Sequence, residues 1–471
     1  MGFWFKVLVK TQNPKPKTQN PKMKELINSL KGDKVIWAFV ALLALFSFMP
    51  VFSASSNLAY MRHGSGNAIT YLLKHAVHIF IGFIIIYQIH KIPYHYFRGI
   101  SMFFLPIIWI LLFYTLVKGT VIDGANASRW MVIPLLGISF QTSTLAAIVL
   151  YVYVARYLSK KREMPVSFQA SLLELWLPVF ITLAFILPAN FSTAALIFAM
   201  VIMLAFIGRY PIKYIAIIIG TGIAAFTLFV LVVLAFPDAF KNRVDTWKNR
   251  IENFTSDKPG EDDYQIEKAK IAIATGGVYG LGPGKSVQKN FLPQSSSDFI
   301  FAIIVEEYGL LGALSILGLY LLLLFRFVIA AHKANSMFGK LVVVGLGFPI
   351  VFQALINMAV AVELLPVTGQ TLPLISSGGS SIWMTCIAIG IILSVTKKDE
   401  EIAQELEEKQ KREDALQKLI DKQLQDDEEE ADENQEKVNQ MKASIKNKIM
   451  EEDQDDYSIT ENPMKAVLHK K

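Results

Sequence analysis

Apolar residues occur along this chain in long unbroken runs rather than in alternation with polar residues. A run of about 20 mostly apolar residues is long enough to cross a bilayer as an α-helix. A helix also satisfies its own backbone polar groups in lipid, whereas a β-barrel would need alternating apolar and polar positions. We therefore predict an all-α polytopic membrane protein with ten transmembrane helices. The ten segments are residues 34–53, 69–91, 98–118, 140–158, 172–187, 190–208, 212–236, 298–326, 340–363 and 379–396.

The loops between these segments carry their positive charges unevenly. If the N-terminus is placed in the cytosol, eleven Lys and Arg residues fall in cytoplasmic loops. The short outer loops then hold only Arg62, Lys118 and Arg129. Because cytoplasmic loops are enriched in Lys and Arg, we predict that both termini are cytosolic. The segments 172–187 and 190–208 are so close that they form a helical hairpin or a re-entrant pair.

Three polar regions flank or interrupt the predicted spans. Residues 1–33 contain the near-repeat TQNPKPK-TQNPKMK and should be disordered, with Met1 or Met23 as the true start. Residues 237–297 form one large outer loop with an Arg- and Trp-rich stretch and a Gly-rich stretch, which favours a functional loop. Residues 397–471 form a charged cytosolic tail, expected to be a solvated helix with disorder or a coiled coil that binds a partner.

The composition excludes several classes of protein. Hydrophobic residues make up 53% and charged residues 18% of the 471, and the mean hydropathy is +0.40. The tail carries 23 acidic and 14 basic residues, whereas the rest of the chain is basic. The basic residues outside the tail flank the apolar runs rather than clustering on one polar segment, so nucleic-acid binding is not expected. Cys386 is the single cysteine, which excludes an intramolecular disulfide and a cysteine-based metal site.

Several carboxylates stand where the large outer loop meets the eighth apolar run. Asp298 lies between a polar loop and the apolar sequence FIFAII. A carboxylate in such a place is partly desolvated and becomes a better proton acceptor, although Asp is equally a common helix N-cap. Glu306 and Glu307 fall about two turns into the run, where ionisable groups are costly. They could line a polar cavity, or they could be a structural pair satisfied by hydroxyl groups or an Arg.

Two further clusters lie near the predicted outer ends of spans. Asp123–Gln141 contains Arg129, which can contact phosphate through two hydrogen bonds, and Trp130, which also suits a membrane interface. Residues 364–381 contain Gly378, Gly379 and Ser380, whose loop could bind an anion or a sugar or could simply reverse the chain. His75 and His78 share a helical face, but two ligands do not make a metal site, so we interpret them as core or cavity residues.

These three clusters together resemble the SEDS family of shape, elongation, division and sporulation proteins. The resemblance rests on GANASRW, on AIATGGVYGLGPGKSVQKNFLPQSSSDFIFAIIVEEYGLLG and on INMAVAVELLPVTGQTLPLISSGGSS, in this order, and covers about residues 34–396. It implies a ten-span enzyme of the bacterial inner membrane that polymerises lipid II at the outer face. It also implies that Asp298 is the essential catalytic acid and that Arg129, Trp130 and the Gly378–Ser381 loop belong to the site.

The resemblance further implies a set of partners and leaves some choices open. A class B penicillin-binding protein and other divisome proteins are expected partners, beside membrane lipid. The Glu306-Glu307 pair and the long tail favour the division-type member over the elongation-type member. The chain departs from the family pattern at Gln141–Thr144, Gln294 and Ser296, where the family has other residues. A mechanism that needs those family residues is therefore in doubt, whereas Asp298 is retained.

The reaction expected from the resemblance joins two lipid-linked disaccharides with loss of undecaprenyl pyrophosphate. Asp298 would act as general base, and nearby cations would neutralise the leaving group. A divalent cation, Mg²⁺ or Mn²⁺, could contribute, but no ligand set is legible. A lipid II flippase or a non-catalytic divisome scaffold remain alternatives. The cationic candidates on the outer side are Arg129, Arg243, Arg250, Lys285 and Lys289.

Overall fold

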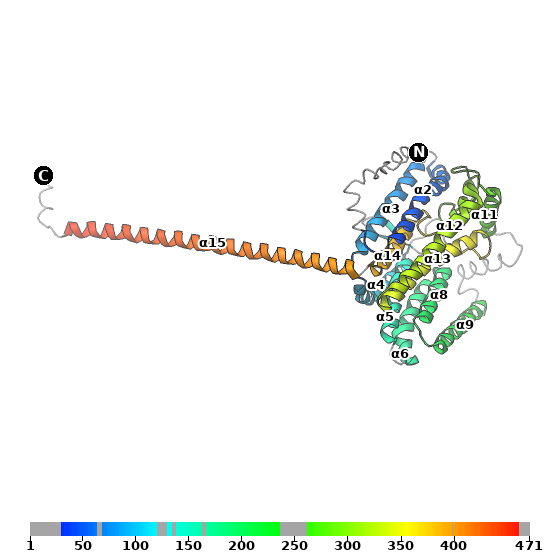
Figure 1. Cartoon of the computed structure of the whole chain (residues 1–471), viewed down its shortest axis with the longest axis horizontal. Helices are drawn as coiled ribbons and strands as arrows, with labels where there is room; N and C mark the ends of the chain where they lie inside the picture. The colour runs from blue at the N-terminus through cyan, green and yellow to red at the C-terminus, as the bar shows by residue number, and fades with distance from the viewer. Residues whose placement is uncertain are drawn as a thin grey trace, which may run out of the picture. The chain divides into compact units, whose positions relative to one another are not determined.

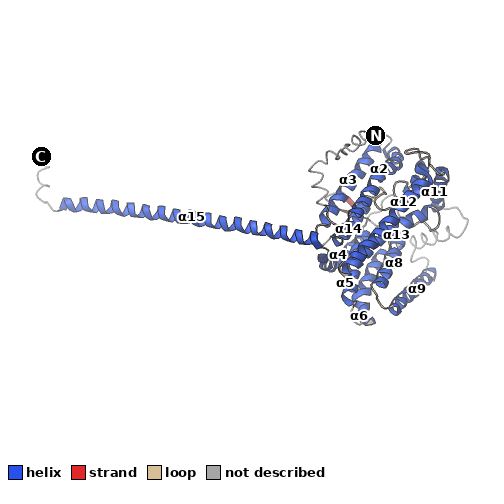
Figure 2. Ribbon diagram, in the orientation of Figure 1, coloured by secondary structure: helices blue, strands red, loops and turns tan. Residues whose placement is uncertain are grey.

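The computed structural model describes residues 30–63, 68–119, 130–133, 138–162, 166–235, 261–397 and 399–460. The chain divides into two compact units, Met1–Lys397 and Lys398–Lys471. The first unit is a bundle of helices, and the second contains one long helix (Figures 1 and 2). Residues 1–29, which we expect to be disordered, and residues 237–260 of the large loop lie outside the described part.

The helices of the first unit follow the apolar runs of the sequence. Short π-helical and 3₁₀ segments join some of them, at Leu172–Trp176, Tyr94–Tyr96 and Gln288–Asn290. The α-helices are α2 (Lys34–His63), α3 (Ala68–Ile89), α4 (Phe97–Lys118), α5 (Thr142–Lys161), α6 (Phe168–Ser171), α7 (Leu177–Ile186), α8 (Phe191–Ile207), α9 (Ile212–Ala235), α11 (Glu261–Gly276), α12 (Ile300–Lys333), α13 (Met337–Ala361) and α14 (Gly379–Val395).

Seven helical segments of the described part are long and apolar enough to cross a membrane. They coincide with the first five, the eighth and the ninth predicted spans. Shorter apolar helices at Phe191–Ile207, Ile212–Ala224 and Gly379–Val395 coincide with the other three. The helical membrane fold is therefore confirmed, and the count of ten spans stays a prediction.

Two local features depart from the predicted helices. A span that starts at residue 140 would be helical there. Residues 138–141 instead form strand β2 (Ile138–Gln141). This strand pairs antiparallel with β1 (Trp130–Ile133), with Trp130 opposite Gln141. In addition, α12 is interrupted at Gly309, whose backbone has φ 66° and ψ −166°. Both features depend on hydrogen bonds outside a single helix, so apolar length alone did not reveal them.

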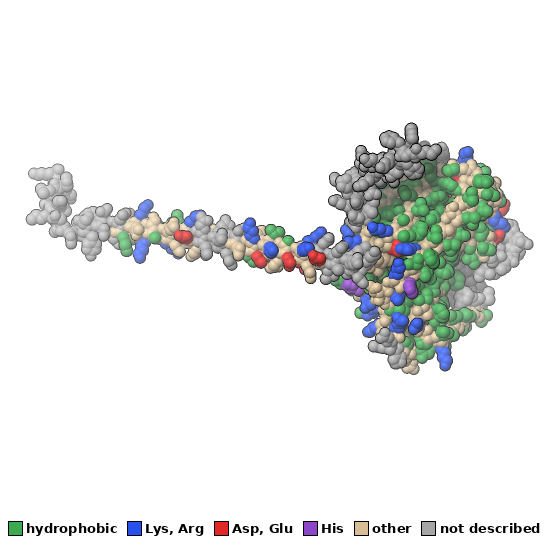
Figure 3. All heavy atoms as spheres, in the orientation of Figure 1, with side chains coloured by type: hydrophobic (Ala, Val, Ile, Leu, Met, Phe, Trp, Pro, Cys, Tyr) green, Lys and Arg blue, Asp and Glu red, His purple; other side chains and the backbone are tan. Residues whose placement is uncertain are grey.

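The outer surface of the bundle is apolar, as expected of a lipid-facing surface. Leu45, Phe80 and Phe103, on three different helices, are 68%, 67% and 68% exposed. Figure 3 shows hydrophobic side chains spread over most of the visible face of the bundle. Inside, α3 packs along α14 and α2, while α12 packs against α13 and α2. In lipid such helices associate through close packing and hydrogen bonds rather than through the hydrophobic effect.

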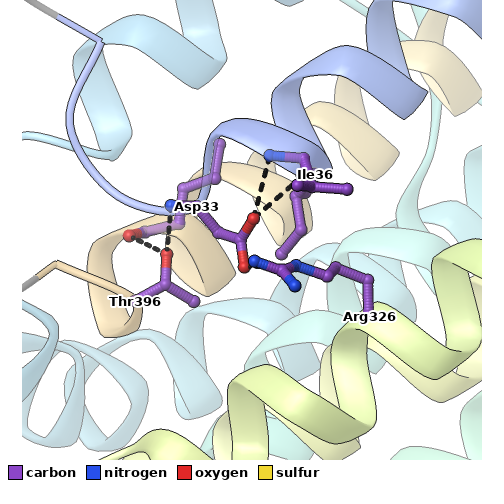
Figure 4. Close-up of polar contacts among 6 residues, drawn as sticks. Asp33, Ile36, Arg326 and Thr396 are labelled. Carbon is purple, nitrogen blue, oxygen red and sulfur yellow. Dashed lines mark hydrogen bonds and ion pairs between the residues drawn. The ribbon is translucent and has the colours of Figure 1, made fainter.

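One end of the bundle is held by a polar cluster around Asp33 (Figure 4). Its carboxylate accepts hydrogen bonds from the backbone N–H groups of Val35, at 2.9 Å, and Ile36, at 3.3 Å, and so caps α2. The same carboxylate pairs with Arg326 Nε of α12 at 2.7 Å. The Asp33 N–H donates to Thr396 Oγ1, just after α14, at 3.0 Å. Three helices from distant parts of the sequence are therefore fixed together here, at what we call the Asp33 end.

The second unit is built from α15 (Asp399–Thr460). Its sequence is dense in charge, and its described side chains are exposed. An isolated helix in water gains no stability from tertiary packing, so charge pairs along its surface matter more. One such pair joins Lys411 Nζ to Glu407 Oε1, one turn apart, at 2.8 Å.

Candidate active site

The backbone of Asp298 is anchored at the end of the bundle opposite Asp33, where α12 begins. Asn357, a buried residue of α13, donates from Nδ2 to the Asp298 carbonyl oxygen at 2.6 Å. The same amide group donates to the Gln370 carbonyl oxygen at 2.7 Å. The N-cap position of α12 belongs to Phe299, whose side chain makes no capping hydrogen bond, and Asp298 lies one residue earlier. Asp298 itself is half-buried, at the boundary between loop and helix.

The loop before Asp298 is joined to the Ser- and Gly-rich loop that precedes α14. Ser377 donates from both its N–H and its hydroxyl to the Ser296 carbonyl oxygen, each at 2.9 Å. The Ser376 hydroxyl donates to the Ser297 carbonyl oxygen at 2.7 Å. Two of the three sequence clusters, 80 residues apart along the chain, therefore lie side by side. We call this region, residues 292–298 with 370–381, the loop site.

The glycines of the loop site allow α3 to approach α14 closely. The His78 ring lies so near Gly379 that a Cβ there would overlap it. The indole N–H of Trp383 donates to the His78 carbonyl oxygen at 3.1 Å. Ser380 is buried, and its hydroxyl has no hydrogen-bond partner among the described residues. His78, which we had interpreted as a core or cavity residue, thus borders the predicted sugar- or anion-binding loop.

The Gly-rich stretch after α11 fills the interruption of α12. The carbonyl oxygens of Glu306 and Glu307, freed by the break at Gly309, accept hydrogen bonds from the N–H groups of Leu281 and Gly282, both at 2.9 Å. Buried backbone groups need such partners. At Gly280, where φ is +80°, a Cβ would overlap the Glu307 carbonyl oxygen. The glycines predicted for a functional loop therefore have a structural reason, because this loop replaces helical hydrogen bonds.

Glu306 and Glu307 are buried among hydrogen-bond donors, and Glu307 Oε2 has no partner among the described residues. Glu306 accepts hydrogen bonds from the Ser286 hydroxyl and from the N–H groups of Val287, at 2.9 Å, and Gln288, at 3.2 Å. Glu307 accepts from the Ser53 hydroxyl of α2 and from the Ser286 N–H. Their exposed fractions are 0% and 1%. The structure thus gives both residues partners that fold the Gly-rich loop, and their role in a polar cavity stays a prediction.

The predicted cations of the site differ in their surroundings. Lys289 is half-buried and donates from Nζ to the Gly284 carbonyl oxygen, at 2.8 Å, and to Ser53 Oγ, at 3.1 Å. Lys285 is exposed. Trp130 is half-buried at the start of β1. Arg129, Arg243 and Arg250 lie outside the described residues, so the structure does not place them.

One more lysine, on α11, pairs with a carboxylate that follows α13. Lys270 of α11 donates from Nζ to Glu363 Oε2, just after α13, at 2.6 Å. This hydrogen bond raises the pKa of Lys270 above its ordinary value. The pair is exposed to solvent, so its contribution to stability is small.

Within the described residues, no three His, Cys, Asp or Glu side chains converge as metal ligands would. The described residues therefore do not fit a metal centre made by the protein alone. We derive no step of the reaction through a metal ion.

A small cleft lies where α4 and α7 end and α5 and α8 begin. Its polar lining includes Thr115, Thr142, Ser143 and Asn190. The sequence analysis missed it, although Thr142 and Ser143 stand in the stretch that departs from the family pattern. The cleft is linked to the loop site, because Gln370 Nε2 donates to Thr193 Oγ1 of α8 at 2.9 Å.

These observations define a class of protein. It is a helical integral membrane protein whose polar site is built from loops at one end of the bundle, around one half-buried carboxylate. The FtsW/RodA/SpoVE family, described as cell cycle proteins, matches residues 33–401, and this chain belongs to that family. The resemblance to SEDS proteins predicted from the sequence is therefore confirmed.

Relatives and solved structures agree with this membership. A protein named probable peptidoglycan glycosyltransferase FtsW, from Geobacter sulfurreducens, is 32% identical over 369 residues, which are 78% of this chain and 95% of that protein. One of the same name from Hydrogenovibrio crunogenus is 33% identical over 371 residues, 76% of this chain and 90% of its own length.

Two solved structures share the fold. One comes from work on the structural coordination of polymerization and crosslinking by a peptidoglycan synthase complex. Its chain has a TM-score of 0.60 and 23% identity, and the match covers 78% of this chain and 97% of that chain. The Thermus thermophilus rod shape determining protein RodA has a TM-score of 0.56 and 23% identity, with 78% and 98% covered. At this identity the likeness establishes the fold.

Proposed function

We propose that this protein polymerises lipid II into glycan strands during septal wall synthesis, with Asp298 as the general base. The glycosyltransferase class expected from the sequence agrees with the shared name of its relatives, and the same name, FtsW, favours the division role. The observation that carries the assignment to Asp298 is its position. It is the half-buried carboxylate at the start of α12, and Asn357 anchors its backbone within the loop site.

The chemistry needs one proton acceptor and a stabilised leaving group. The 4-hydroxyl of the acceptor GlcNAc attacks the anomeric carbon of MurNAc at the end of the growing strand. Asp298 takes the proton of that hydroxyl, and undecaprenyl pyrophosphate departs with the electrons of the broken bond. A positioned base of this kind contributes about 100- to 10,000-fold in rate. Lys285, exposed in the same loop region, can offer its charge to the pyrophosphate.

The orientation follows from the positive charges of the loops. We place the loop site at the outer face of the inner membrane and the Asp33 end, with both termini, in the cytosol. Arg326 of α12 lies at the Asp33 end, as the excess of Lys and Arg in cytoplasmic loops requires. A growing strand and its lipid-linked precursor would then meet at the membrane surface, where the lipid tails remain between the apolar helices.

A class B penicillin-binding protein, which cross-links glycan strands, is the partner that we propose. One of the structural relatives comes from a peptidoglycan synthase complex that coordinates polymerization with crosslinking. An elongation role of the RodA type, a lipid II flippase and a non-catalytic scaffold are the competing functions.

One assay separates these functions. The purified full-length protein is supplied with lipid II in detergent or nanodiscs, with and without a class B penicillin-binding protein. Glycan strands made by the wild type but not by Asp298→Asn support the polymerase. Movement of lipid II across a vesicle membrane without polymer would indicate a flippase, and neither activity would leave a scaffold. Depletion in cells then distinguishes division from elongation, since filaments are expected for a septal enzyme.

A further inference from the structure

One stretch of the tail helix combines exposed apolar side chains with positive charge only. Residues 437–450, KVNQMKASIKNKIM, lie within α15 and contain four lysines and no acidic residue. Val438, Met441, Ile445 and Ile449 follow one another at intervals of three, four and four residues, which places them on one helical face. Their exposed fractions are 46%, 69%, 54% and 54%. We call residues 437–450 the basic stripe.

The lysines border the apolar face on both sides. At about 100° per residue, Lys442 and Lys446 lie along one edge of the face, and Lys437 and Lys448 lie along the other. The side chains of Asn439, Gln440, Ala443, Ser444, Asn447 and Met450 occupy the remaining surface. This order of apolar centre, cationic edges and an uncharged, mostly polar back is typical of helices that lie in the surface of an anionic membrane. The long lysine stems can follow the apolar face while their ammonium groups reach lipid phosphates.

A second apolar stripe of the same helix lacks this pattern. Leu416, Leu419, Ile420 and Leu424 are also exposed, but Lys418, Asp421 and Lys422 among them bring both signs of charge. The stretch between the two stripes, residues 425–436, is acidic. An anionic surface would repel that stretch and attract the basic stripe. The distribution of charge therefore favours the basic stripe as the binding segment of the tail and an anionic surface as its partner.

We propose that the basic stripe binds the anionic phospholipid surface of the membrane in which the first unit is embedded. The tail follows the last helix of the bundle, α14, after a few residues, so the stripe can never diffuse far from the bilayer. Such tethering raises the effective concentration of lipid that the stripe meets. About 38 helical residues, or roughly 57 Å at 1.5 Å per residue, precede it, and the acidic part of this arm is held off the surface by its charge. The tail would then form a spacer with a reversible lipid anchor.

Hydrogen exchange of the full-length protein in nanodiscs tests this proposal. One nanodisc preparation contains phosphatidylcholine alone, and the other contains 30% phosphatidylglycerol. We expect exchange in residues 437–450 to slow about tenfold in the anionic nanodiscs at low salt and to return at about 0.5 M salt, where charges are screened within a few ångströms. Exchange in residues 416–424 should not depend on the lipid.

Two matched variants make the result specific. Lys442→Glu, Lys446→Glu and Lys448→Glu together should abolish the lipid-dependent protection. Lys409→Glu, Lys418→Glu and Lys422→Glu change the net charge of the tail equally and should leave it intact. Equal exchange in both lipids would overturn the proposal. Protection that is independent of lipid but rises with protein concentration in micelles would overturn it in favour of a second copy of the tail as partner.

Discussion

Asp298 and the pair Glu306-Glu307 belong to one stretch of chain, yet the structure treats them differently. The glutamates are buried, and their carboxylates accept several hydrogen bonds from the Gly-rich loop and α2. Asp298 is half-buried, and Asn357 holds its backbone oxygen rather than its carboxylate. A carboxylate that folds a loop must keep its partners, whereas a general base must exchange them for substrate. The difference in burial therefore separates the two roles where residue type cannot.

The largest effect should follow from removal of the Asp298 charge. In Asp298→Asn we expect the rate of lipid II polymerisation to fall about 100- to 10,000-fold, because the amide cannot accept the proton. The apparent melting temperature should change little, since Asn has the size and shape of Asp and the hydrogen bond from Asn357 goes to the backbone. Glu267→Gln, an exposed carboxylate on α11, is the matched control and should retain full activity. Polymerisation by Asp298→Asn at the wild-type rate would remove the assignment.

Glu306→Gln should instead affect stability. Its new amide group would face donors that the carboxylate now satisfies, so buried hydrogen-bonding groups would be left unpaired. We expect a loss of about 3 kcal/mol in the free energy of unfolding. Thermal unfolding followed by tryptophan fluorescence measures this loss, and activity per folded molecule should stay near the wild type. If the variant were as stable as the wild type but inactive, Glu306 would belong to the catalytic group.

Asn357→Ala should reduce activity less than Asp298→Asn, because it displaces the catalytic carboxylate without removing it. Loss of the amide frees both the Asp298 and the Gln370 carbonyl oxygens, and small displacements of a catalytic group cost about tenfold to a hundredfold in rate. Gln353, one turn earlier on α13, anchors only Thr371 and provides the matched control, Gln353→Ala. The pH dependence of kcat should keep its shape in Asn357→Ala, because the base is unchanged. A shifted profile would mean that Asn357 tunes the carboxyl group itself.

The apolar runs predicted the helices well because the length and apolar character of a segment depend only on its own residues. The break at Gly309 was missed because the hydrogen bonds that compensate for it come from residues distant in sequence, Leu281 and Gly282. The β1–β2 hairpin was missed because its strands are only four residues long and adjoin an apolar helix. Asp298 was found through its motif. Asn357 was not, although an amide inside an apolar run is a signal in itself, since buried polar groups in lipid need partners. The contact between the two loops of the loop site could not be predicted from the sequence, because it depends on the packing of α12, α13 and α14.

The smallest effects should distinguish the two lysines of the Gly-rich loop. Lys285 is exposed, and an exposed charge contributes about 0.2–1 kcal/mol, so Lys285→Ala should raise the KM for lipid II about twofold to fivefold without changing stability. Lys289→Ala removes hydrogen bonds to Ser53 and Gly284 and should cost about 1 kcal/mol of stability with little change in KM. Steady-state kinetics and thermal unfolding of both variants test this contrast. If the two effects were exchanged, Lys289 would be the residue that meets the pyrophosphate, and the hydrogen bonds from Lys289 would have to break when substrate binds.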